Sequence, residues 1–157
     1  MRPPAFQAVI DEHGQPLYRY LVAAVGVHDA NDCFQETMLA ALRAYPRLQH
    51  RDNVGGWLFT IAHHKVIDSA RSRERRAVPV GAAVDVGGAE MTELPDPPDG
   101  ALWKKVGALP TKQRSAVLLR YVADRSYAEI GAALECSEAA ARQNVRAALQ
   151  RLREETT

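Results

Sequence analysis

The chain has little of what stabilises secreted proteins or anchors membrane proteins. It has only two cysteines in 157 residues, Cys33 and Cys136, far apart in sequence. Each falls in a predicted helix where a small apolar residue would serve, so we expect unpaired structural thiols rather than a redox pair. No apolar run approaches the ~18 residues of a membrane span. The start, MRPPAF, lacks the apolar segment of a secretory signal, so we expect a cytoplasmic protein with no membrane insertion.

Residue patterns for catalysis or cofactor binding are also missing. No serine or cysteine sits in a recognisable nucleophile elbow, no glycine-rich loop follows a strand, and the acidic residues form no acid/base pair. His63, His64 and Asp68 offer the best metal-binding pattern, because the last two are one helical turn apart. Zinc would require at least one or two more ligands. We therefore expect no enzyme, no metal, no cofactor and no small-molecule substrate.

The net charge of +1 hides three unlike segments. Lys and Arg number 10 against 8 Asp and Glu in residues 1–76, 0 against 5 in 77–100, and 10 against 6 in 101–157. The middle segment clusters Gly and Pro without helical periodicity, which indicates a flexible acidic linker. The sequence thus predicts two small domains that are basic overall, an arrangement that suits a protein gripping a polyanion at two places.

The first segment predicts four helices and no strand, at 4–12, 17–25, 29–45 and 57–76. We expect a break at His13-Gly14 and an N-cap at Asp29. In the third helix, Phe34, Met38, Ala41 and Tyr45 recur at helical spacing and predict a buried stripe. The opposite side presents a polar strip with one leucine: Asp32, Gln35, Glu36 and Leu39.

The fourth predicted helix combines a core face with a cationic edge. The core face includes Phe59, Ala62, Val66 and Ala70. The edge consists of His64, Lys65, Asp68, Arg71, Arg75 and Arg76. Arginines at a helix C-terminus are also stabilised by the helix dipole without any ligand. Trp57, after the loop RDNVGG that contains Asn53, is either a base-stacking group or a core tryptophan.

The last segment predicts helices at 99–107, 111–122, 127–134 and 138–153, with Val117, Leu118 and Tyr121 facing inward. Ser126 and Glu129 form a capping box. A turn at Glu135-Cys136 precedes a helix capped by Ser137, with a buried stripe of Ala141, Val145, Ala148 and Leu152. Arginine and glutamine are then left pointing outward, as a major-groove reader requires: Arg142, Gln143 and Arg146. We interpret this as a helix-turn-helix; the alternative is a three-helix bundle with a solvated face.

Three segments in this order, DCFQETMLAAL, WLFTIAHHKVIDSARSRERR and LPTKQRSAVLLRYVADRSYAEIGAALECSEAAARQNVRAALQRLR, resemble a bacterial extracytoplasmic-function sigma factor over nearly the whole chain outside the linker. The resemblance implies an all-α protein with sigma region 2 in 1–76, a linker in 77–100 and sigma region 4 in 101–157. It also implies that core RNA polymerase and promoter DNA, both duplex and melted, are partners, and that an anti-sigma factor is a further one.

Residue roles follow from the same resemblance. The strip Asp32, Gln35, Glu36 and Leu39 matches the polymerase-binding segment. The resemblance assigns recognition of the minus-ten element to Asn53, Trp57, His64, Lys65, Asp68, Arg71, Arg75 and Arg76. It assigns recognition of the minus-35 element to Tyr127, Ser137, Arg142, Gln143 and Arg146. His64 replaces a usual asparagine and Ala147 a usual arginine, which implies an altered minus-ten preference and weaker phosphate contact.

Two other classes remain as alternatives. One is a helix-turn-helix regulator whose N-terminal domain senses a signal or dimerises. The polar strip on 29–45 and the basic 57–76 helix argue against it, because a sensing domain needs neither. The other is an adaptor that binds polymerase without DNA, and the outward Arg142 and Arg146 argue against that.

Overall fold

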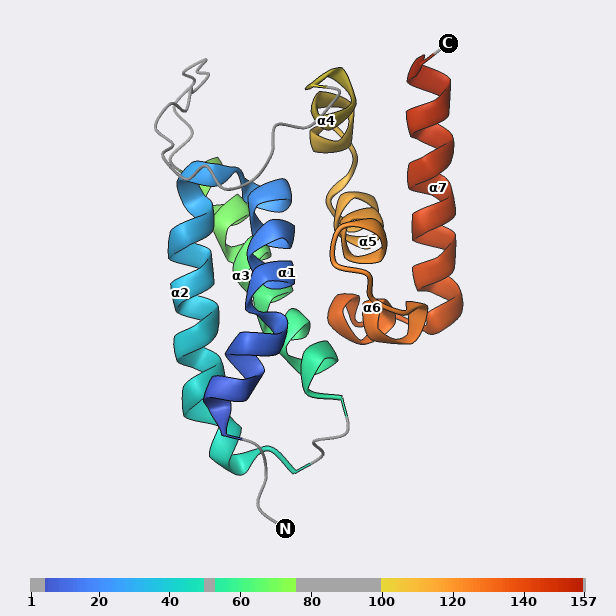
Figure 1. Ribbon diagram of the computed structural model, residues 1–157. Coiled ribbons are helices and arrows are strands. Elements are labelled where there is room, and N and C mark those ends of the chain that lie inside the picture. The colour runs from blue at the N-terminus through green and yellow to red at the C-terminus, as the bar shows by residue number, and fades with distance from the viewer. Residues whose placement is uncertain (1–4, 50–52, 76–99, 157) are drawn as a thin grey trace.

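The computed structural model of the chain describes residues 5–49, 53–75 and 100–156 (Figure 1). Every regular element in these ranges is a helix, and none is a strand, so the predicted all-α class is confirmed. The predicted linker, 77–100, lies outside the described residues except for Gly100, which is the first residue of a helix. We call residues 5–75 the first module and residues 100–156 the second module. None of the helices in the described ranges is long and apolar enough to cross a membrane.

The first module contains α1 (Phe6–Val25), α2 (Val27–Ala44), the 3-10 turn η1 (Tyr45–Arg47) and α3 (Val54–Arg75). The predicted break at His13-Gly14 is wrong, because α1 continues through it and even through Pro16. Gly14 is buried, and a Cβ there would lie 4.0 Å from Phe34 of α2. Buried side chains lie on both sides of the predicted break, including Val9 and Leu17. Packing of this whole face outweighs the ~1 kcal/mol that an interior glycine costs a helix.

Two helix starts also differ from the sequence prediction. The cap of α2 is Gly26, not Asp29; its φ of 89° is one that glycine adopts readily, and it makes a one-residue turn between α1 and α2. Helix α3 begins at Val54, three residues before the predicted start. The side-chain oxygen of Asn53 accepts a hydrogen bond from the Gly56 amide at 2.9 Å and caps this extra turn. Much of the predicted RDNVGG loop is therefore helix.

The second module contains α4 (Gly100–Gly107), α5 (Thr111–Tyr121), α6 (Tyr127–Leu134) and α7 (Glu138–Thr156). The predicted capping box of α6 is present: Ser126 accepts from the Glu129 amide at 3.1 Å, and the Glu129 carboxylate accepts from the Ser126 amide at 2.9 Å. Glu135 ends α6 in the left-handed conformation, with φ 60°. The predicted inward placement of Tyr121 is wrong, because this side chain is 61% exposed.

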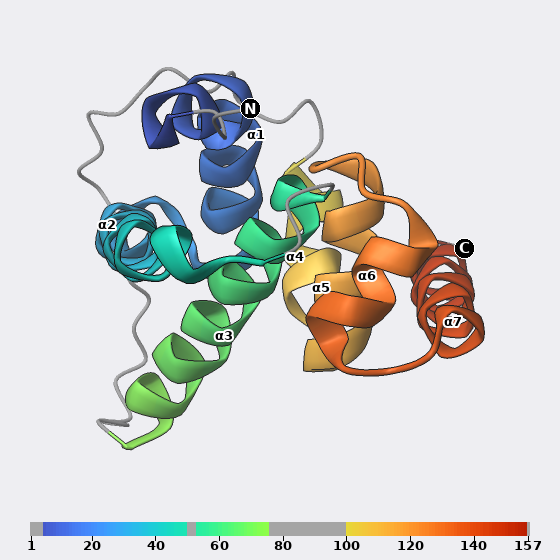
Figure 2. The ribbon, with the colours of Figure 1, turned by 90° about the horizontal axis from the view of Figure 1, so that it is seen from below.

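The two modules contact one another. Helix α3 packs against α1 and α2 on one side and against α6 on the other, and α1 also contacts α5 (Figure 2). Helices α2 and α7 lie on opposite flanks of this arrangement (Figure 1). We call the contact of α1 and α3 with α5 and α6 the seam. The seam could not be predicted from local sequence patterns, because the residues involved are more than 40 positions apart.

Candidate nucleic-acid interface

The outer face of α7 carries the side chains predicted to read duplex DNA, and all of them are exposed: Arg142, Gln143 and Arg146. The Arg142 guanidinium lies 4.7 Å from the centroid of the Tyr127 ring at the start of α6, and Arg120 of α5 lies 4.3 Å from the same centroid. Stacking on a ring restricts a long side chain before any ligand arrives. The arrangement therefore presents a partly ordered guanidinium fork at the helix surface.

A groove of about 570 Å³ runs beside these residues between α6 and α7. Its polar lining is mainly cationic and includes Arg142, Arg146, Gln150 and Arg153. Ser137 lies at the start of α7, where its hydroxyl accepts from the Ala140 amide at 3.0 Å and thus caps the helix as predicted. A cationic groove along a recognition helix can follow a phosphate backbone while the exposed face meets base edges.

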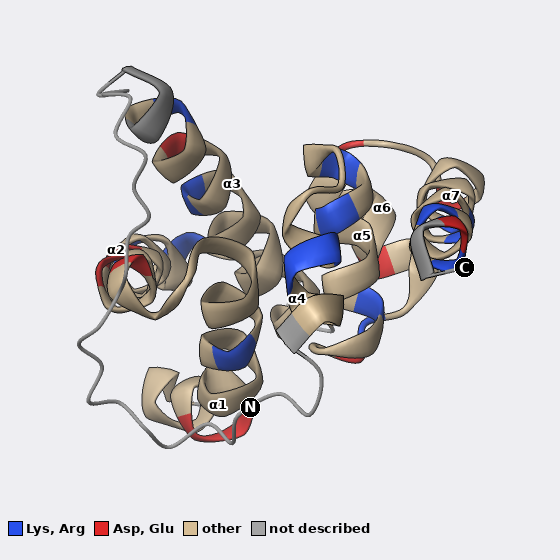
Figure 3. Ribbon diagram, turned by 90° about the horizontal axis from the view of Figure 1, so that it is seen from above, with Lys and Arg blue, Asp and Glu red and all other residues tan. Residues whose placement is uncertain are grey.

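The charge distribution differs between the modules. Figure 3 shows basic positions along α4, α5 and α7, and acidic positions on α2. The acidic side chains of the α2 strip, Asp32 and Glu36, are exposed, and so are Gln35 and Leu39. This strip therefore repels a polyanion, and its charge suits a protein surface rather than DNA.

An apolar groove that the sequence analysis missed adjoins this strip. It has a volume of about 540 Å³ and lies between α1 and α2, lined by Phe6, Ile10, Phe34, Met38, Leu39 and Leu42. Leu39 and Leu42 are 51% and 52% exposed. Phe34 and Met38 were assigned to a buried stripe but are only half-buried, because no described helix covers this face. The spacing of Leu39 and Leu42, three residues apart on the polar side, was the signal available in the sequence.

The residues predicted for the minus-ten element follow α3. His64, Asp68 and Arg71 are exposed, and Lys65 is half-buried. Arg75 ends the helix, whereas Arg76 lies outside the described residues. Asn53 caps α3, and half-buried Trp57 packs against Tyr45 with 6.2 Å between ring centroids. Both therefore hold the start of α3 in place, whatever else they contact.

The histidine pair on α3 does not form a metal site with Asp68. His63 is buried, and its Nδ1 lies 3.4 Å from the Tyr20 hydroxyl, whereas His64 is exposed and pairs across the seam with Glu135, Nε2 to Oε2 3.2 Å. In the described part of the chain, no three His, Cys, Asp or Glu side chains gather in a way that could hold a metal ion.

Both cysteines are free thiols, as expected: Cys33 is buried and Cys136 half-buried. Burial, together with the nearby Glu36 and Asp29 carboxylates, raises the pKa of the Cys33 thiol. A raised pKa disfavours the reactive thiolate, so Cys33 is a structural side chain of the core.

Comparisons with known proteins agree with this geometry. Residues 9–76 match the family model described as sigma-70 region 2, and residues 99–152 match the one described as sigma-70, region 4. Among curated proteins, the chain is 31% identical over 160 residues to the ECF RNA polymerase sigma factor SigL of Mycobacterium tuberculosis, covering 94% of this chain and 86% of SigL. It is 32% identical over 163 residues to SigD of the same organism, covering 96% of this chain and 76% of SigD.

Solved structures show the same fold. The sigma factor RpoE of Bartonella quintana, in complex with the anti-sigma factor NepR, matches with a TM-score of 0.78 and 22% identity, covering 95% of this chain and 94% of that one. CnrH, in complex with the cytosolic domain of CnrY, matches with a TM-score of 0.71 and 21% identity, covering 97% and 87%. The chain therefore belongs to the extracytoplasmic-function family of RNA polymerase sigma factors, regulatory proteins that bind core RNA polymerase and direct promoter-specific initiation of transcription.

Proposed function

We propose that the two ends of the chain divide promoter recognition between them. Residues 1–76 bind polymerase and the minus-ten element, residues 101–157 bind the minus-35 element, and residues 77–100 connect them. The observation that carries this proposal is the helix-turn-helix of α6 and α7, whose outer face presents Arg142, Gln143 and Arg146 beside a cationic groove. Arginine can form a bidentate contact with guanine, and glutamine can do so with adenine.

The polymerase-binding surface consists of the α2 strip and the adjoining apolar groove. Asp32, Gln35 and Glu36 supply its polar edge, and Leu39 and Leu42 supply its apolar part. Two half-exposed leucines beside carboxylates suit an amphipathic helix with basic flanks, because such a helix buries its apolar side and pairs its charges at the rim. This chemistry supports the assignment of the surface to a protein partner rather than to DNA.

The minus-ten surface follows the exposed edge of α3. His64 and Lys65 come first, and Asp68 and Arg71 follow. Arg75, the last residue of α3, and Arg76, which lies outside the described residues, are assigned to the same surface. Unstacking a base costs a few kcal/mol, which contacts to the flipped base and cationic contacts to the displaced strand offset. Asn53 and Trp57 stand at the start of α3, where a melted base would enter. Tyr127 and Ser137, at the starts of α6 and α7, would contact the minus-35 backbone.

Further partners follow from the relatives. RpoE is in complex with the anti-sigma factor NepR, and CnrH is in complex with the cytosolic domain of CnrY. A similar anti-sigma protein would find the exposed apolar groove between α1 and α2 available in this chain. The protein would act in the cytoplasm, as a non-enzymatic subunit of polymerase.

Run-off transcription tests the proposal directly. Purified core enzyme is assayed with and without this chain on a library of promoters, and the supported result is initiation at a subset with shared minus-35 and minus-ten sequences. Initiation equal to that of core enzyme alone, together with sequence-specific DNA binding by the chain, would instead support the alternative of a helix-turn-helix regulator.

A further inference from the structure

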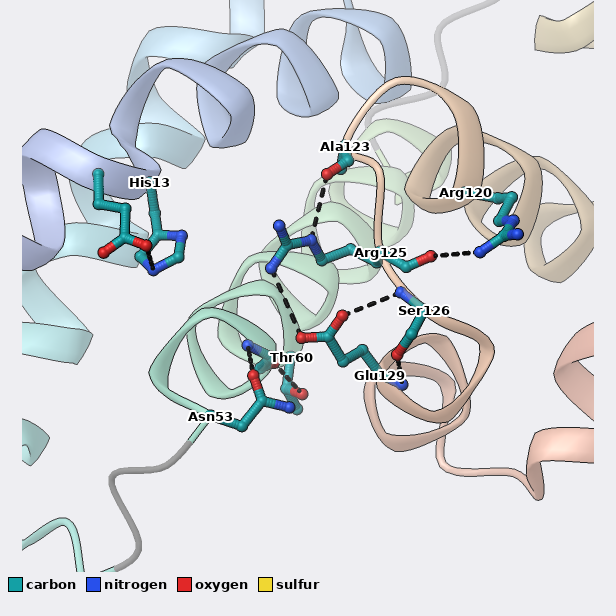
Figure 4. A network of polar contacts seen from close by, with 10 residues as sticks. His13, Asn53, Thr60, Arg120, Ala123, Arg125, Ser126 and Glu129 are labelled. Carbon is teal, nitrogen blue, oxygen red and sulfur yellow. Dashed lines mark hydrogen bonds and ion pairs between the residues drawn. The ribbon is translucent and has the colours of Figure 1, made fainter.

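Histidines are concentrated at the seam. Three of the five histidines in the chain, His13, His63 and His64, lie on its first-module side. His13 comes from α1 and the other two from α3, so two helices bring them together against the same face of the second module. Figure 4 shows His13 on α1 facing the Arg125–Glu129 pair at the start of α6.

His63 is enclosed by groups from both modules. The Tyr20 hydroxyl of α1 lies 3.4 Å from its Nδ1, and the residue is only 6% exposed. From the second module it faces Lys112 of α5 and Glu135 at the end of α6, and its neighbour on α3 is His64. Because α5 and α6 help to cover it, moving the second module away would return the imidazole to water.

His13 meets a fixed positive charge across the seam. Its side chain is 14% exposed and faces Glu12 of its own helix, with Arg125 and Glu129 opposite. The Arg125 guanidinium pairs with Glu129 at 3.6 Å and lies 5.0 Å from the Phe59 ring centroid of α3. Space is tight here, since a Cβ on Gly55 would lie 2.8 Å from His13 Cε1 and 2.7 Å from Arg125 Nη1. His13 and Arg125 therefore approach the same part of the α3 backbone, one from each module.

We infer that the seam is an acid-sensitive contact: protonation of His63 and His13 separates the second module from the first. We call the arrangement described here the closed form and the separated one the open form. Opening would also release His64 from Glu135, which frees a residue assigned to the minus-ten surface; that consequence, unlike the opening itself, rests on the proposed function.

The direction of the effect follows from burial. Burial is the largest cause that lowers the pKa of His63, to about 4 from its ordinary 6.5, and burial likewise lowers the pKa of His13, with Arg125 adding to the shift. A histidine with a lowered pKa binds protons less readily in the closed form, so the closed form is fully favoured above pH 6.5 and loses stability as the pH falls from 6.5 towards 4. For His63 alone, the ratio of closed to open molecules falls roughly tenfold between pH 7.5 and 5.5.

Several contacts oppose this change. The Glu12 carboxylate, 3.9 Å from His13 Nε2, and the Glu129 carboxylate both favour the protonated form of His13. A positive charge on His64 strengthens its pairing with Glu135, and Lys112 and Glu135 act on His63 in opposite directions. The His64 and Glu135 side chains are 51% and 73% exposed, so water screens their attraction. His63 is buried and has no carboxylate within ion-pair distance in the described part of the chain. It therefore determines that a lower pH favours the open form.

The test measures the two forms without polymerase or DNA, so its result is independent of the proposed function. Dyes are placed on the flanking helices at Asn31→Cys of α2 and Arg151→Cys of α7, with both native cysteines changed to alanine in the full chain. Single-molecule energy transfer then counts closed and open molecules between pH 7.5 and 5.5. Circular dichroism at each pH verifies that the helices remain folded.

Two variants separate the expected result from its alternatives. His63→Gln keeps a polar group beside Tyr20 but cannot take up a proton, so it should lose most of the tenfold shift. His28→Gln, at an exposed position on α2, should respond as the wild type does. A wild type that is open at pH 7.5, or that keeps the same ratio down to pH 5.5, would overturn the inference, and so would a His63→Gln variant that responds fully. If His63→Gln does not fold, His63→Asn decides, because it also cannot take up a proton and a response as large as that of the wild type would equally overturn the role of His63.

Discussion

Gly131 of α6 lies tightly against the backbone of the turn that joins α6 to α7, so Gly131→Ala should destabilise the second module. A Cβ at this position would lie 2.7 Å from the Cys136 carbonyl oxygen and 3.2 Å from both the carbonyl carbon and oxygen of Ser137. Ordinary van der Waals contact requires about 3.5 Å. All three atoms belong to the backbone of the turn, so no side-chain rotation can relieve the overlap. Helix α6 and the turn must move apart by several tenths of an ångström.

The magnitude is the balance of two effects. Overpacking a closely packed site costs about 1–3 kcal/mol, and the absence of a flexible neighbour places Gly131→Ala near the upper value. Alanine in place of an interior helical glycine gains about 1 kcal/mol. The net loss is about 2 kcal/mol in the free energy of unfolding, equivalent to a Tm lower by about 4–8 °C in a chain of this size.

Gly107→Ala is the matched control. Gly107 ends α4, and a Cβ there would meet nothing within 4 Å. The same substitution should therefore be neutral or stabilise by up to about 1 kcal/mol. Urea unfolding followed by circular dichroism measures both variants, and binding to minus-35 duplex DNA tests whether the α6–α7 angle is altered. If Gly131→Ala is as stable as wild type and Gly107→Ala, the reasoning about this turn is wrong.

Three further predictions concern single contacts. Arg142→Ala should lower transcription from a minus-35-dependent promoter by a factor equivalent to about 1–3 kcal/mol of binding free energy. Arg142→Lys should recover little of that loss, because lysine keeps the charge but lacks the guanidinium fork. Equal activity of the wild type, Arg142→Ala and Arg142→Lys would contradict the base contact. Glu36→Arg should weaken binding to core polymerase roughly tenfold by reversing a charge in the α2 strip, and unchanged affinity in a competition assay would remove Glu36 from that surface. Ser126→Ala should lower the free energy of unfolding by about 1 kcal/mol, since the Glu129 amide loses its acceptor, and a loss below a few tenths would count against the capping box.

Features that depend on neighbouring residues could be predicted from the sequence. The capping box of Ser126 and Glu129 and the cap at Ser137 involve groups three residues apart, and both were correct. The outward placement of Arg142 and Arg146 followed from helical periodicity alone. The helix-turn-helix and the all-α class depend on such local signals, which is why the sequence sufficed for them.

Features that depend on distant residues were missed or wrong. The break expected at His13-Gly14 is absent because Gly14 is buried against α2, a contact invisible to local propensity. Tyr121 has the spacing of a core residue but lies on a face that no described helix covers. The apolar groove beside Leu42 depends on how α1 packs along α2, because Phe6 and Ile10 line it together with residues of α2, and local periodicity does not reveal that packing. The roles of the individual DNA-binding and polymerase-binding residues remain predictions.

The seam joins two modules of a single polypeptide. A weaker attraction is therefore enough to hold them together than two separate proteins would need. Parts tethered by a short connection meet at an effective concentration on the order of millimolar. If the two modules, as separate proteins, would associate with a dissociation constant of about a millimolar, half of the molecules of the single chain are already closed. The side chains around His63 and Arg125 then need only a weak attraction to favour the closed form, and where that preference is only a few-fold, a ligand that prefers the open form by a modest factor can reverse the populations.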